Sequence, residues 1–268
     1  MSEVDFLNDA IAERFGFVRR ARGPFLYTQK GVRLTDLYRD AGRAVLGWGG
    51  TGAFTMFKNV LSRGLTGSFP TCFSGRLLKA VETLLDSKRK IFVFNDRQKA
   101  LSAAVVISSE ETFFWKPWSP EGVVWSSADC VIVESPLAWT PGIFILAVLD
   151  NEKNEAALAG LALSSVRISA AVEAACARSI YDIILAVQSK SEKDWFIYDT
   201  VLTKYWERRG PYLYPKVPKE KYREFAEHCL DCAVVVSPFY DVPGIVPFGA
   251  DPGVFSALKK KPFVMEKI

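Results

Sequence analysis

The fold of this chain is decided at residues 90–105, which read KIFVFNDRQKALSAAV. The apolar run at 90–94 has the length and composition of a short buried strand. Asn95 and Asp96 follow it at once, and both are strong helix N-caps, so they predict a helix that begins directly after the strand. Within that helix we expect four side chains to face inward, those of Ala100, Leu101, Ala104 and Val105. The stretch therefore indicates a strand–turn–helix unit.

Similar elements extend from this unit in both directions. A helix is expected before it at 76–86, and short apolar strands are expected after it at 112–115, 128–134 and 142–148. The spacing of apolar side chains between residues 168 and 187 predicts a long helix with one buried face. Apolar strands separated by helical segments predict an α/β fold with a mostly parallel sheet that helices cover on both faces.

The ends of the chain have a different pattern. Residues 2–15 predict an amphipathic helix, and residues 25–38 predict a hairpin whose turn places Gly31 at positive φ. Towards the other end, Gly210-Pro211 interrupts the helical pattern, and a strand, a helix and a second short strand are expected beyond it. We therefore expect a large domain at 1–209 and a small C-terminal domain at 210–268.

The amino-acid composition excludes several classes of function. Of its 268 residues 49% are hydrophobic, which excludes intrinsic disorder, and a net charge of +4 is too small to indicate nucleic-acid binding. His228 is the single histidine, so a Ser/His/Asp triad or a zinc site of several histidines has no basis. Cys229 and Cys232 have CxxC spacing but no second pair, and we expect them to be buried structural thiols. No metal site is predicted.

The location of the protein is also constrained. The longest apolar stretch, at 131–149, contains Glu134, Pro136 and Pro141, so it predicts two strands around a turn and no membrane span. The first residues have neither the basic nor the apolar segment of a signal peptide. The chain has five cysteines, an odd number, which is consistent with thiols that stay reduced. We expect a cytoplasmic protein.

Four stretches, in this order along the chain, resemble parts of the class III aminotransferases, which are pyridoxal-phosphate (PLP) enzymes of fold type I. Residues 25–37 are similar to the family's N-terminal hairpin, with Thr28 where the family has Asp. Residues 95–100 lie where it places a phosphate loop, and 131–136 resemble a strand that ends in Val-Glu-Pro. Residues 212–255 resemble its small C-terminal domain.

The resemblance implies an α/β architecture, namely a three-layer sheet domain shortened relative to the family, with a small C-terminal α+β domain. It implies PLP as a possible cofactor and a homodimer as the assembly. It also implies a set of cofactor-binding residues, which are Asn95, Asp96, Arg97, Gln98, Trp115 and Glu134. The segment at 54–70 is similar to the loop that meets the partner subunit in the family.

The chain departs from the family where the chemistry is concentrated. PLP enzymes need a lysine that forms a Schiff base and an acid that pairs with the pyridine nitrogen. Asp150, at the end of an apolar run, is the candidate acid, and Lys190 is the one lysine behind both an apolar run and a serine. Helical periodicity explains that run better, which places Lys190 at a helix end. Asp96, as an N-cap, would repel a phosphate. We therefore predict no catalytic residue.

Three hypotheses follow for the function. The first is a degenerate aminotransferase-like protein that does not transaminate and acts through a retained pocket or as a partner subunit, for instance of a full-length aminotransferase. The second is an active PLP-dependent aminotransferase with a rearranged site. The third is an unrelated α/β interaction protein. The pair Arg208-Arg209 suits either a clamp for a substrate carboxylate or a salt-bridge role.

Overall fold

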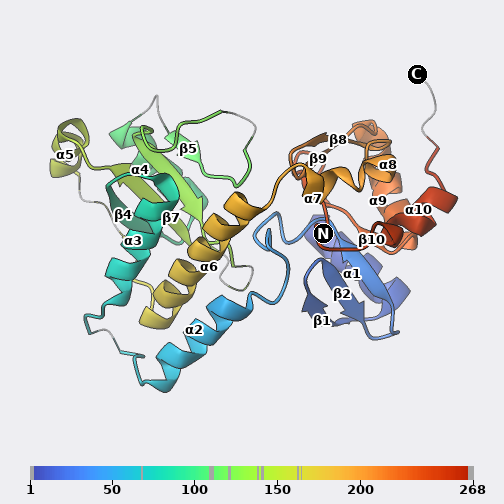
Figure 1. The fold of residues 1–268 in the computed structure, drawn as a ribbon, viewed down its shortest axis with the longest axis horizontal. Helices are drawn as coiled ribbons and strands as arrows, with labels where there is room; N and C mark the ends of the chain where they lie inside the picture. The colour runs from blue at the N-terminus through green and yellow to red at the C-terminus, as the bar shows by residue number, and fades with distance from the viewer. Residues whose placement is uncertain are drawn as a thin grey trace. The chain divides into compact units, whose positions relative to one another are not determined.

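The computed structural model describes residues 3–67, 69–108, 112–119, 122–137, 139, 142–161, 163 and 165–264. The chain forms two compact units (Figure 1). The first unit combines residues 1–49 with residues 190–268, and the second unit comprises residues 50–189. Both ends of the chain therefore contribute to one unit, whereas the other unit is a continuous segment.

The second unit is built on a four-stranded sheet with the order β4-β7-β6-β5. Its strands are β4 (Arg89–Phe94), β5 (Thr112–Phe114), β6 (Cys130–Glu134) and β7 (Phe144–Leu149). Only β5 and β6 pair in parallel, because β7 pairs antiparallel with both β4 and β6. Three of the four strands thus run in one direction, and β7 is the exception to the expected mostly parallel sheet. The connection from β6 to β7 is shorter than the dozen or so residues that a parallel crossover requires, so β7 returns antiparallel.

Helices cover both faces of this sheet. On one face lie α2 (Thr51–Ser62), α3 (Phe73–Leu85) and α6 (Ala170–Ser189), and α6 contacts both of the others (Figure 1). On the other face lie α4 (Arg97–Ile107) and α5 (Glu152–Ala159). Successive residues of β6 point to opposite faces of the sheet. Val131 and Val133 belong to the core beneath α3 and α6, and Ile132 belongs to the core beneath α4. This arrangement confirms the three-layer α/β architecture.

The helix α4 follows β4 as predicted, with one difference in its buried face. Ala100 and Ala104 are fully buried, but Val105 is 45% exposed, so its expected inward position is wrong. Ile107 is buried in its place. Residues 100, 104 and 107 follow the spacing of one helical face, and Val105 lies about 100° away from that face.

The first unit contains a four-stranded sheet with the order β1-β2-β3-β10. Its strands are β1 (Val18–Arg22), β2 (Phe25–Thr28), β3 (Arg33–Asp36) and β10 (Val234–Val235). The predicted hairpin is β2–β3, and Gly31 in its turn has a φ of 78°. The helices α1 (Glu3–Phe15) and α9 (Tyr222–Asp231) contribute Ile11 and Leu230 to one core with Leu34 and Val235.

The remainder of the first unit consists of short elements. A three-stranded sheet joins β8 (Trp206–Arg209), β9 (Tyr212–Pro215) and β11 (Gly244–Ile245), and the helices are α7 (Lys193–Phe196), α8 (Asp199–Leu202) and α10 (Ser256–Lys260). 3₁₀ turns lie at 219–221 and 252–255. The boundary expected between residues 209 and 210 lies inside this unit, in the turn of the β8–β9 hairpin, because the small C-terminal elements pack with the N-terminal hairpin.

Two further expectations concern burial and membranes. Cys229 and Cys232 are buried, free thiols, as predicted. Among the helices of the described ranges, none has both the length and the apolar character that crossing a membrane requires.

Candidate functional site

Three strands of the second unit end at the same edge of its sheet. β5 and β6 are parallel, and β4 runs in their direction because β4 and β6 both pair antiparallel with β7 between them. The residues that follow these strands, Asn95, Trp115 and Ser135, therefore lie along one edge, which we call the carboxyl edge. In α/β sheets ligands bind preferentially outside the carboxyl ends of the strands. This edge is the candidate site.

The first turn of α4 lies at the carboxyl edge and is exposed. The Asp96 carboxylate accepts a hydrogen bond of 2.8 Å from the backbone N–H of Lys99, which confirms the predicted N-cap. The guanidinium carbon of Arg97 lies 4.1 Å from the centroid of the Phe114 ring on β5. Asn95 and Gln98 flank these two residues and are exposed. The Asp96 carboxylate thus accepts a hydrogen bond from one of the backbone N–H groups that would bind a phosphate at a helix N-terminus.

Trp115 and Glu134 also lie at the carboxyl edge, but on opposite faces of the sheet. Trp115 packs against the core beneath α3 and α6, and its backbone N–H donates to the Ile132 carbonyl at 2.9 Å. Glu134 is half-buried and lies directly opposite Phe144, which belongs to the core beneath α4. Because directly opposed residues on paired strands share a face, Glu134 lies on the α4 side.

A buried polar contact at this edge was not predicted. The Ser135 hydroxyl lies 3.2 Å from the Cys176 sulfur of α6, and both residues are buried. Burial raises the pKa of the Cys176 thiol to about 11, so the thiol is protonated at neutral pH. The sequence signal for Ser135 was its place after an apolar run, but nothing in the spacing connects it to Cys176, which lies on a distant helix.

Asp150 does not share an edge with the other predicted site residues. Since β7 is antiparallel, its end lies beside the start of β6, where the N–H of Leu149 donates to the Asp129 carbonyl at 2.8 Å. The Asp150 carboxylate lies 3.6 Å from the Lys90 ammonium at that opposite edge. Its expected role as an acid beside Asn95 and Trp115 is therefore wrong. The reason is the direction of β7, which an apolar run does not reveal.

Lys190 directly follows α6, as the helical periodicity predicted. Its ammonium lies 5.1 Å from the centroid of the Phe248 ring and 3.8 Å from the Asp194 carboxylate, and its side chain is 29% exposed. These contacts are made within the first unit.

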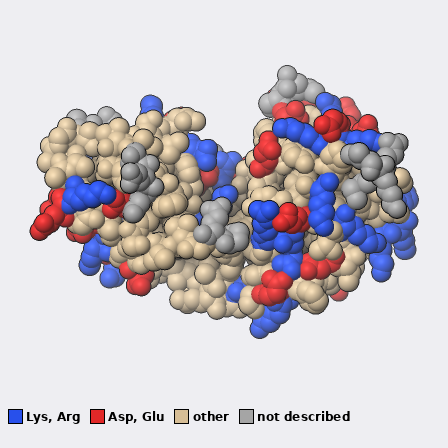
Figure 2. All heavy atoms as spheres, turned by 90° about the horizontal axis from the view of Figure 1, so that it is seen from above, with Lys and Arg blue, Asp and Glu red and all other residues tan. Residues whose placement is uncertain are grey.

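The Arg208 guanidinium has a salt-bridge role in the first unit. It pairs with Glu192, and its Nε lies 2.6 Å from the Asp199 carboxylate. Figure 2 shows the same pattern more widely, with Lys and Arg intermingled with Asp and Glu over the visible face of this unit. In the described part of the chain, no group of His, Cys, Asp and Glu side chains could hold a metal ion.

The three-layer unit, the capped helix after β4 and the N-terminal hairpin together define an aminotransferase-like fold. In structure the chain is similar to an ornithine aminotransferase from Plasmodium yoelii, with a TM-score of 0.64 and 10% identity over 97% of this chain and 100% of that one. It is similar as well to an acetylornithine aminotransferase from Elizabethkingia anophelis, with a TM-score of 0.63 and 10% identity over 90% of this chain and 91% of that one. The resemblance to class III aminotransferases therefore holds at the level of the fold.

In sequence the chain is similar to uncharacterised proteins of two spirochaetes. It is 27% identical to one from Treponema pallidum, over 88% of this chain and 91% of that protein. It is 24% identical to one from Borreliella burgdorferi, over 93% of this chain and 91% of that protein. No family model matches the chain.

Proposed function

We propose that this chain is a shortened, non-transaminating protein on the aminotransferase fold, which acts through a pocket at the carboxyl edge or as a partner subunit. The observation that carries the proposal is the placement of the two groups that transamination would need. Asp150 is paired with Lys90 at the opposite edge of the sheet, and Lys190 is engaged with Phe248 and Asp194 in the first unit.

The residues of the carboxyl edge also fit PLP poorly. If it were bound here, PLP would supply an electron sink, and a lysine would be needed to hold its aldehyde. The described lysines nearest in sequence to this edge are Lys99 and Lys116, and both are exposed. The carboxylate of Asp96 caps α4 where the cofactor phosphate would bind. Binding of PLP through the predicted set stays a prediction, and that set is Asn95, Asp96, Arg97, Gln98, Trp115 and Glu134.

Borohydride reduction tests the proposal. The purified chain is incubated with PLP, its absorption is recorded, and peptides are mapped by mass spectrometry after reduction. We expect no stoichiometric lysine adduct, because the Lys190 ammonium is engaged with Phe248 and Asp194 and Lys116 is exposed. A stoichiometric adduct on one lysine, lost in Lys190→Ala or Lys116→Ala, would instead establish the alternative of an active aminotransferase with a rearranged site.

We further propose that the protein assembles as a homodimer through the outer faces of α2 and α6. Phe54 is 53% exposed and Leu61 38% on α2, and Tyr181 is 36% exposed and Leu185 59% on α6. Phe54 and Leu61 lie on one side of α2, Tyr181 and Leu185 lie on one side of α6, and the two helices contact each other. The segment at 54–70 overlaps α2, which the resemblance associates with a partner subunit. A full-length aminotransferase would be a partner of the same kind.

Sedimentation velocity tests this assembly. We expect the native chain to sediment as a dimer and Leu185→Glu to shift it to a monomer, because a charge would be buried at the interface. Val106→Glu is the matched control, since Val106 is 63% exposed on α4. A native monomer, or equal effects of both variants, would contradict the proposed face. We also propose a cytoplasmic location, which the five free cysteines favour.

A further inference from the structure

A groove on the second unit lies beside β4, a strand at the end of the sheet order. It consists of two adjoining hollows, each of about 260 Å³, which share Ser74, Arg167, Ile168 and Glu173. The segment at 165–168 forms one wall, held beside β4 by a hydrogen bond of 2.7 Å from the Val166 N–H to the Val93 carbonyl. Each hollow alone is a little smaller than the roughly 300–1,000 Å³ that is typical of small-molecule sites, and the shared residues join the two into one groove. We call it the α3–α6 groove.

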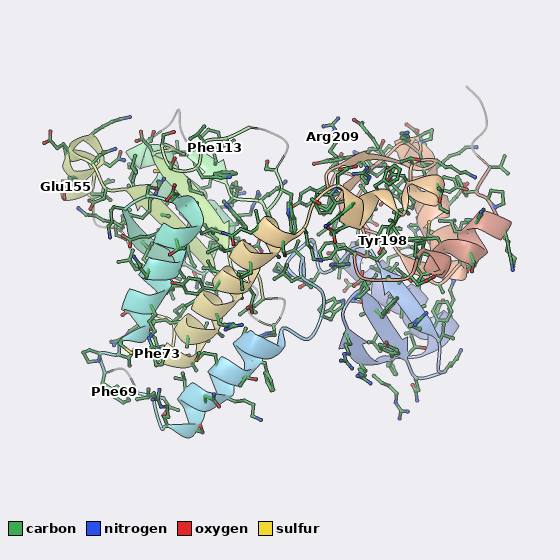
Figure 3. All side chains as sticks on the ribbon, viewed as in Figure 1. Phe69, Phe73, Phe113, Glu155, Tyr198 and Arg209 are labelled. Carbon is green, nitrogen blue, oxygen red and sulfur yellow. The ribbon has the colours of Figure 1, made fainter. Side chains whose placement is uncertain are left out.

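The groove has an apolar end and a second end with an aromatic ring. Leu77 of α3 and Ile91 and Val93 of β4 line the first hollow. Phe69 and Pro70 line the second. Figure 3 shows Phe69 close to Phe73, the first residue of α3. An apolar side chain therefore has a surface to bury against at either end.

Two opposite charges lie where the hollows join. Glu173 is half-buried in the first turn of α6, and Arg167 precedes that helix and is exposed. Within the described ranges, the Glu173 carboxylate and the Arg167 guanidinium have neither an ion pair nor a hydrogen bond with each other or with another side chain. Burial raises the pKa of Glu173, and the charge of Arg167 offsets part of this effect. A half-buried carboxylate without a direct side-chain partner can accept the hydrogen bonds of an ammonium group, which would favour its charged form.

We propose that the α3–α6 groove binds a free amino acid with an apolar side chain, with its ammonium group on Glu173 and its carboxylate on Arg167. The ligand side chain lies against Leu77, Ile91 and Val93. Arg is the residue best suited to a carboxylate, because its guanidinium offers two parallel donors. A ligand with a single charge would leave either Glu173 or Arg167 without a partner. The inference does not depend on the proposed lack of transamination, because Glu173 and Arg167, which would hold the two charges of the ligand, are not among the residues assigned to the carboxyl edge.

The simpler interpretation is that Glu173 only complements the dipole of α6, as acidic residues in first turns commonly do. Calorimetric titration of the full chain distinguishes this interpretation from the proposed amino-acid site. L-leucine and L-phenylalanine are the probes, and 4-methylpentanoate and 3-methylbutylamine are analogues that lack the ammonium and the carboxylate of leucine respectively. We expect at least one amino acid to bind, and both analogues to bind about tenfold more weakly or worse.

Variants then locate the site. Glu173→Gln and Arg167→Gln should each weaken binding by about tenfold or more, whereas Arg178→Gln should leave it unchanged. Arg178 is the matched control because it lies on α6 and pairs with Asp182 at 2.9 Å, outside the groove. Ser74→Trp should abolish binding by filling the junction of the two hollows. Absence of binding by both amino acids, or unchanged binding in both charge variants, would overturn the proposal. Thermal unfolding of each variant verifies that it is folded.

Discussion

The stability of the first unit should depend strongly on Arg39. Arg39, Asp40 and Ala41 have consecutive positive φ angles of 46°, 54° and 56°, a left-handed turn that costs energy in residues other than glycine. The Arg39 side chain is fully buried inside this turn. Its guanidinium donates to the Val45 carbonyl at 2.8 Å and to the Val246 carbonyl at 3.1 Å, so it joins the turn to the C-terminal segment.

The substitution Arg39→Met removes these bonds while keeping an unbranched side chain of similar length. Three hydrogen bonds from a charged donor are lost, and the Asp36, Val45 and Val246 carbonyl groups each lose a donor. The buried Asp36 carboxylate, which accepts the Trp48 indole N–H at 2.8 Å, loses a neighbouring positive charge. We expect the free energy of unfolding to fall by about 3–5 kcal/mol. The backbone strain at residue 39 does not contribute to this difference between the native chain and the variant, because a positive φ is equally unfavourable for Arg and Met.

Urea titration with hydrogen exchange measured by mass spectrometry provides the assay. Exchange should increase in peptides from residues 1–49 and 190–268 and much less in those from 50–189. Arg43→Met is the matched control on the same turn, since Arg43 is 23% exposed and pairs with Asp40 at 2.9 Å. Such a pair contributes roughly 0–1 kcal/mol. If the two variants lost the same stability within about 0.5 kcal/mol, the buried bonds of Arg39 would carry no net stabilisation and the reasoning would fail.

Three further variants test other parts of the fold. Burial raises the pKa of Asp129, but hydrogen bonds from Lys153, Asn154 and Ser108 lower it more, so its pKa lies below the usual value. Asp129→Asn should therefore lower the free energy of unfolding by about 1–3 kcal/mol at pH 7. This difference from the native chain should vanish as the pH falls through the pKa of Asp129 in the folded state, and urea titrations across pH would measure it. Asp96→Ala removes the cap of α4 and should cost about 1 kcal/mol in chemical unfolding. Gly47 has a φ of 92°, and in Gly47→Ala the added Cβ would lie 2.9 Å from the Gly23 Cα. This variant should therefore have a lower melting temperature than Gly64→Ala, in which the added Cβ has no atom within 4 Å.

The local elements could be predicted because their signals lie within a few residues of one another. The Asp96 cap, the buried Ala100 and the positive φ of Gly31 each follow from short-range chemistry. The pairing of strands could not be predicted in the same way. An apolar run such as 144–149 indicates burial on both faces, but it carries no information on direction, so the antiparallel β7 was not anticipated.

The sequence signals at the limits of the two compact units are weaker than the one at residues 210–211. Gly210-Pro211 is a strong break in sequence, yet here it is the turn of a hairpin between two paired strands. The junctions at 49/50 and 189/190 carry weaker signals, a glycine-dense loop and the end of a long helix. The contact of Ser135 with Cys176 and the meeting of Arg167 and Glu173 in a groove depend on α6 packing across the sheet, which no local pattern encodes.

The direction of β7 has a consequence for function that extends beyond topology. Asp150 follows the end of β7, whereas Glu134 lies opposite Phe144 at its start. With a rise of roughly 3.3 Å per residue, the two carboxylates are about 20 Å apart along the sheet. An acid that pairs with a cofactor near the first turn of α4 would have to come from the carboxyl edge, where Glu134 is half-buried on the α4 side. Glu134→Gln is therefore more informative than Asp150→Asn for any ligand of this edge, and an effect confined to Asp150→Asn would contradict the assignment of the site to the carboxyl edge.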